Sequence, residues 1–99
     1  MTVALMWEAR AVDGRGPELL EWAHAQAEVL AAAPVRREIL RAPQGRVLVI
    51  TWWDAPYEAE LPELPEPEAE LIARAVHRWR FESVEADGRD ASAGAGPNG

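Results

Sequence analysis

Two histidines and a single tyrosine are the side chains of this sequence best suited to acid–base chemistry. His24 falls beside the apolar stripe of a predicted helix, where its imidazole can accept a proton from a phenol, since imidazole titrates near neutral pH. Tyr57 falls in a predicted loop, where its hydroxyl can orient the same ligand. The pattern also allows structural roles, with His24 as a half-exposed boundary residue and Tyr57 as an anchor for its loop. We take His24 and Tyr57 as candidate catalytic residues.

Tryptophan is the dominant aromatic residue, with five copies in 99 residues. Trp52 and Trp53 end the apolar stretch RVLVITWW, and adjacent residues of a strand point to opposite faces of a sheet. One of them should therefore face a helix-covered interior and the other the opposite side. Trp7, Trp52 and Trp53 are candidate platforms for a flat ligand, and core packing with locally paired indole N–H groups is the structural alternative.

His77 is predicted at the end of a second helix, where it can serve as an axial haem ligand or simply favour the negative end of the helix dipole. The sequence lacks the other common motifs of catalytic, metal and phosphate sites. It contains no cysteine, no Ser-His-Asp arrangement, no H-E-x-x-H motif and no phosphate-binding loop. The G-x-G-x-x-G spelled by Gly94, Gly96 and Gly99 has no strand before it and no helix after it. We therefore expect no metal and no cofactor.

The net charge of −7 is concentrated in one segment, because Asp54 to Glu70 contains seven acidic residues and no arginine. An acidic chain without a basic stripe repels phosphate backbones, which argues against nucleic-acid binding. The first residues carry no basic region before their apolar positions and no run long enough to cross a bilayer. A cytoplasmic protein without membrane contact is expected.

The periodicity predicts a β-α-β-β-α-β order in residues 1–86 and a disordered tail in residues 87–99. Pro17 suits the first turn of a helix, and Ala42 to Gly45 has the composition of a turn between two strands. The predicted strands are residues 2–12, 35–41, 46–53 and 79–86, and the predicted helices are residues 17–32 and 67–77.

Right-handed crossovers arrange these elements as a ferredoxin-like α+β fold, with both helices on one face of a four-stranded antiparallel sheet. The spatial order is the fourth, first, third and second strand. The interior strand from Arg46 to Trp53 carries apolar or β-branched residues on both of its faces. Because this short chain can cover only one face with its own helices, we expect a homodimer through the other face.

This element order, with a strand ending in VITWWD before a loop, resembles the dimeric α/β-barrel superfamily, and in particular the antibiotic biosynthesis monooxygenase-like proteins. The resemblance covers residues 1–86. It implies a homodimer with face-to-face sheets and a cavity between helices and sheet in each subunit. Members include cofactor-free oxygenases of aromatic polyketides and haem-degrading proteins. In haem-degrading members an asparagine lies on the first strand, and this sequence has none there.

The sequence therefore predicts a small homodimer that binds an aromatic or polyketide-like ligand in a helix–sheet cavity. A cofactor-independent monooxygenase is the enzymatic form of this hypothesis, with Trp7, Trp52 or Trp53 as the platform. A non-catalytic dimeric accessory module is the first alternative. A haem-binding or haem-degrading protein, with His77 as the ligand, is the second.

Overall fold

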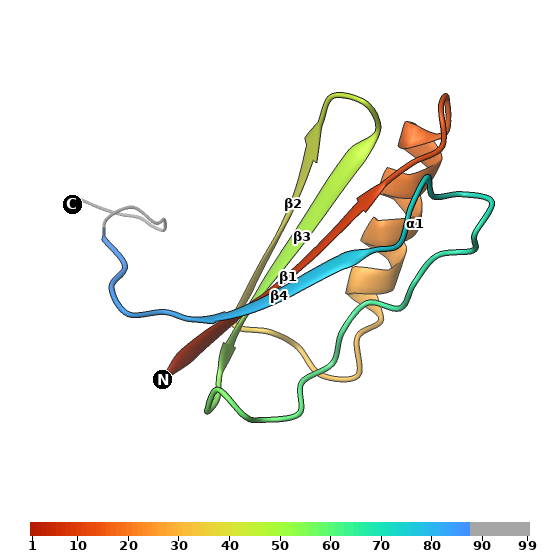
Figure 1. Ribbon diagram of the computed structural model, residues 1–99. Coiled ribbons are helices and arrows are strands. Elements are labelled where there is room, and N and C mark those ends of the chain that lie inside the picture. The colour runs from red at the N-terminus through yellow and green to blue at the C-terminus, as the bar shows by residue number, and fades with distance from the viewer. Residues whose placement is uncertain (88–99) are drawn as a thin grey trace.

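The computed structural model describes residues 1–87 and contains one four-stranded antiparallel sheet (Figure 1). Its strands are β1 (Thr2–Arg10), β2 (Arg36–Ala42), β3 (Arg46–Asp54) and β4 (His77–Glu82). They lie in the order β2-β3-β1-β4, with every neighbouring pair antiparallel. The predicted strand order is therefore confirmed. The tail predicted to begin at Asp87 lies outside the described residues apart from Asp87 itself.

One helix, α1 (Gly16–Glu28), packs on the sheet within residues 1–87, and it is shorter than the predicted span of residues 17–32. It has Pro17 in its first turn, where a missing N–H costs nothing. It ends before Leu30, whose carbonyl would meet the ring of Pro34 if the helix continued. The buried side of α1 consists of Leu19, Ala23 and Ala27.

The predicted second helix over residues 67–77 is wrong. Residues 55–76, here called the strap, run from β3 to β4 without a helix and cross the same side of the sheet as α1 (Figure 1). The backbone of the strap pairs with the end of β1 instead. Ala11 forms an antiparallel bridge with Ile72, and the amide of Val12 donates to the carbonyl of Leu71 at 3.0 Å. Pairing with the sheet replaces helical hydrogen bonds there, which also allows β4 to begin at His77, two residues earlier than predicted.

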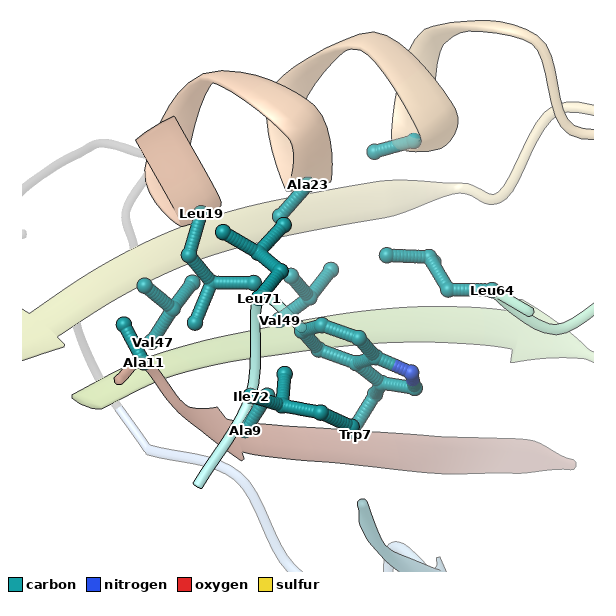
Figure 2. Close-up of a cluster of buried hydrophobic side chains, with 11 residues drawn as sticks. Trp7, Ala9, Ala11, Leu19, Ala23, Val47, Val49, Leu64, Leu71 and Ile72 are labelled. Carbon is teal, nitrogen blue, oxygen red and sulfur yellow. The ribbon is translucent and has the colours of Figure 1, made fainter. Parts of the chain in front are cut away.

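The hydrophobic core lies between α1, the strap and one side of the sheet, here called the inner face. Figure 2 shows Trp7 of β1, Val49 of β3 and Leu19 of α1 meeting side chains of the strap. Leu64, Leu71 and Ile72 of the strap are all buried there. The strap, which has no regular secondary structure, thus covers the part of the sheet where a second helix was predicted.

A tight turn joins β2 to β3. Gln44 and Gly45 both have positive φ, at 68° and 71°, a conformation that glycine adopts without strain. Gly45 also lies against Ala11, where a Cβ atom on residue 45 would approach the Ala11 Cβ to 3.1 Å. Pro43 and Gly45 predict this turn, and it sets the register in which β3 pairs with β2.

Candidate functional site

An open groove of about 690 Å³ lies between α1 and the β2–β3 hairpin, on the inner side of the sheet. The residues that line it come from the helix on one wall and from the hairpin on the other: Gly16, Pro17, Leu20, Glu21 and His24, facing Ile39, Arg41, Ala42, Gly45, Arg46 and Val47. No strap residue lines the groove. It is the part of the inner face that the strap, crossing nearer β4, leaves uncovered.

One wall of this groove is α1, which packs on the sheet through small residues. Ala23 and Ala27 are buried, and with no bulk beyond Cβ they bring α1 close to the central strands. Leu20 and His24 stand one turn apart on the side of α1 that faces β2. Ile39 of β2, paired with Val49, is only half-buried, because β2 is the edge strand of the sheet within residues 1–87.

Polar groups stand above an apolar floor in the groove. Leu20, Ile39 and Val47 supply apolar surface, while Glu21 and His24 on the helix wall face Arg41 on the strand wall. The His24 side chain is 59% exposed, and its Nε2 lies 3.9 Å from Oε2 of Glu28. The groove therefore combines a proton acceptor, a carboxylate and a guanidinium around a surface that fits an apolar body.

Trp7 and Trp53 belong to the packed interior. The Trp7 ring stacks on Trp22 of α1 with centroids 5.7 Å apart, and its indole N–H donates to the carbonyl of Pro65 at 3.2 Å. The Trp53 indole N–H donates to the hydroxyl of Thr51 at 2.8 Å. Both indoles are at least 95% buried and hydrogen-bonded within the protein, which matches the core-packing alternative.

Trp52 and His77 lie on the other side of the sheet, here called the outer face. Trp52 stacks under the guanidinium of Arg36, 4.6 Å from the ring centroid, so the two adjacent tryptophans do occupy opposite faces. His77 packs edge-on against Trp79 with centroids 5.6 Å apart. The sheet thus separates His77 from His24, and the two histidines share no site.

Tyr57 lies at the start of the strap, away from the groove. Its hydroxyl donates to the carbonyl of Arg80 at 3.3 Å, and the Arg80 guanidinium donates to the carbonyls of Tyr57 and Ala59. This reciprocal contact anchors the strap to β4. Of the candidate residues named from the sequence, the structure places His24 alone in the groove.

A charged cluster on the outer face was missed in the sequence. The side chain of Glu8 on β1 is only 5% exposed, accepting a hydrogen bond from Nε of Arg46 at 3.0 Å and two from Nη2 of Arg74. His77 Nδ1 lies 3.5 Å from the same carboxylate. Burial alone would raise the pKa of Glu8, but the hydrogen bonds and charges of Arg46 and Arg74 outweigh it and hold that pKa below its usual range. An acid inside an otherwise apolar interior strand was the available signal.

Comparison with protein families, with curated proteins and with solved structures finds no match. Within residues 1–87, no group of three or more histidine and acidic side chains is arranged to hold a metal ion. In the same part of the chain, α1 is neither long nor apolar enough to cross a membrane.

Proposed function

We propose that this protein is a ferredoxin-like homodimer that binds a small aromatic or polyketide-like molecule in the groove between α1 and the β2–β3 hairpin. The observation that carries the proposal is the groove itself, whose volume of about 690 Å³ suits a ligand of a few fused rings. The strand order β2-β3-β1-β4 supports the ferredoxin-like assignment, with the strap in place of the second helix.

The lining of the groove supports this class of ligand. A flat apolar body would lie on Leu20, Ile39 and Val47, where it gains the free energy of apolar burial. A phenolic hydroxyl or a carboxylate at one end of the ligand would meet His24 and Arg41 from opposite walls. In this proposal His24 retains the role of proton acceptor, whereas Trp7 and Trp53 are core residues that do not line the groove.

Binding of 2-naphthol, followed by its own fluorescence, tests the proposal. Leu20→Glu should raise the dissociation constant at least about tenfold, because it replaces apolar lining by a charge that must be desolvated. Val29→Glu is the matched control, since Val29 follows the same helix and is 71% exposed outside the groove. Equal effects of the two substitutions, or no saturable binding to the unaltered protein, would reject the groove as the site.

Oxygen uptake then separates an oxygenase from a binding protein. With a bound, readily oxidised dihydroxynaphthalene and no added metal, an oxygenase should consume O2 at a rate that falls in His24→Gln while binding persists. Saturable binding with no oxygen uptake would instead establish a non-catalytic protein. A Soret band on addition of haemin, lost in His77→Ala, would favour the haem alternative.

The outer face supports the homodimer. Its central strands present Ala4, Met6, Leu48, Ile50 and Trp52, and β4 adds Trp79 and Phe81, which are 44% and 53% exposed. A contiguous apolar sheet face of this kind usually meets another protein surface. Pairing with the same face of a second copy would bury it by a twofold axis, because such an interface is self-complementary.

Light scattering at micromolar concentration tests the dimer. The unaltered protein should show twice the mass of one chain, and Ile50→Glu should give the monomer mass with the same circular dichroism. Val84→Glu is the control, because Val84 is an apolar residue that is 93% exposed beyond the end of β4. A monomeric unaltered protein would contradict this part of the proposal and leave the groove experiment unaffected.

A further inference from the structure

One end of the outer face, next to the β2–β3 turn, concentrates positive charge. Arg10 of β1 and Arg46 of β3 are direct partners across the two strands. Glu8, two residues before Arg10 on the same face, is paired on its other side with His77 of β4. Arg74, at the end of the strap, reaches the same carboxylate. We call Arg10, Arg46, Arg74 and His77 around Glu8 the basic cluster.

The charges of the basic cluster do not balance. Two guanidinium groups, of Arg46 and Arg74, contact the single Glu8 carboxylate, and Arg10 is a third arginine at the same end of this face, although the whole chain carries a net charge of −7. Within residues 1–87, Glu8 is the only acid in an ion pair with Arg46 or Arg74, and Arg10 has no ion-pair partner. Like charges directly opposite each other on neighbouring strands destabilise a sheet. Glu8 offsets the charge of Arg46, and a further negative group beside Arg10 would offset the remaining repulsion.

Glu8 holds two of these guanidinium groups in place. Its buried carboxylate accepts from Nε of Arg46 and from Nη2 of Arg74, which fixes both side chains against the sheet. The two terminal nitrogens of Arg46 make no hydrogen bond to the described part of the protein. In the single chain the Arg46 and His77 side chains are each 52% exposed. The cluster lies at the end of the outer face next to the β2–β3 turn, beside the apolar residues proposed for the dimer contact, so solutes reach it from that end.

We propose that the basic cluster binds a small oxyanion, a phosphate or carboxylate group, through Arg10 and the free terminal nitrogens of Arg46. Guanidinium groups match the oxygens of both anions with paired, charge-assisted hydrogen bonds. In this arrangement Glu8 is a positioning residue, since it orients Arg46 and Arg74 without contacting the anion. The cluster is centred on the outer face and the groove on the inner face, with Arg46 at the border of both. The proposal does not rest on ligand binding in the groove.

Calorimetric titration of the full chain with sodium phosphate, and separately with sodium succinate, tests the site and separates the two sources of oxyanion. Ionic strength is held constant with sodium chloride, because screening alone changes surface electrostatics. At least one anion should bind saturably at neutral pH, and Arg10→Gln should weaken it about tenfold, the worth of charge-assisted hydrogen bonds. Arg46→Lys should also weaken it, because lysine keeps the charge and loses the planar fork.

Arg36→Gln is the matched control, since it makes the same charge change at the other end of the outer face, where Arg36 contacts Trp52 and Glu38. Loss of binding in Arg10→Gln with retention in Arg36→Gln supports the site. Equal weakening by both substitutions, or no saturable binding of either anion, overturns it. Light scattering provides a further outcome. If the unaltered protein binds neither anion and Arg10→Gln lowers the mass, the cluster forms a contact between copies of the chain, and the anion-site proposal is overturned.

Discussion

Arg74 donates from Nη2 to both carboxylate oxygens of Glu8, at 2.8 and 2.9 Å, across 66 positions of sequence. The contact fastens the end of the strap to β1 just before the chain enters β4. Arg46 holds the same carboxylate from the β3 side at 3.0 Å. One buried acid therefore ties three separate segments of the chain together.

Glu8→Gln should lower the free energy of unfolding by about 2 kcal/mol at neutral pH, because it removes charge-assisted hydrogen bonds. Folding lowers the pKa of Glu8 from its ordinary value of 4.5, so the carboxylate stabilises the native state above that value. This contribution is lost as the pH falls below 4.5 and through the lower native pKa. Urea unfolding across acidic pH should show the variant and the unaltered protein converging.

Glu18→Gln is the control for that series. Glu18 also has a lowered pKa, through its hydrogen bond from Arg15, but the pair is exposed at the start of α1. Its removal should change stability far less than removal of Glu8, because exposed ion pairs are screened by water. Equal pH profiles for the two variants would contradict the central role of Glu8.

Trp7→Ala should lower the free energy of unfolding by about 3–5 kcal/mol, the usual cost of deleting a buried tryptophan. The substitution removes the stack on Trp22 and the hydrogen bond to Pro65, so it loosens both α1 and the strap. Thermal unfolding measures the change. Trp22→Phe provides a comparison, because it keeps an aromatic ring at the stack, and it should cost much less than Trp7→Ala.

Arg80→Ala should loosen the strap while leaving the sheet intact. The substitution strands the carbonyls of Tyr57 and Ala59 and removes the cation from above the Tyr57 ring, 5.9 Å away. We expect faster amide hydrogen exchange in residues 57–64 and a loss of about 1–2 kcal/mol of stability. Unchanged exchange in the strap would show that its apolar contacts through Leu64 suffice. Arg36→Ala, on the outer face, should leave exchange there unchanged.

The sequence predicted the sheet because local patterns carried the information. Apolar residues on both faces of the segment from Arg46 to Trp53 identified an interior strand, and Pro43 with Gly45 identified the hairpin turn. The opposite orientation of Trp52 and Trp53 followed from strand geometry alone. The second helix failed for the opposite reason. Leu71, Ile72, Ala75 and Val76 have helical spacing, but the backbone at Leu71 and Ile72 pairs with the end of β1, a contact with no local signature.

The features of the candidate site also divide into those that the sequence predicts and those that depend on tertiary contacts. The sequence by itself determined the two-sided apolar character of β3 and the place of His24 beside the apolar stripe of α1, because each depends on periodicity within one element. The strand order followed from the order of the elements and the right-handed crossover rule. Only the tertiary structure decided that Trp7 and Trp53 are core residues, that Tyr57 anchors the strap, and that Glu8 gathers arginines from β3 and the strap. Those outcomes depend on which distant segments meet, and packing between elements, not periodicity within them, decides that.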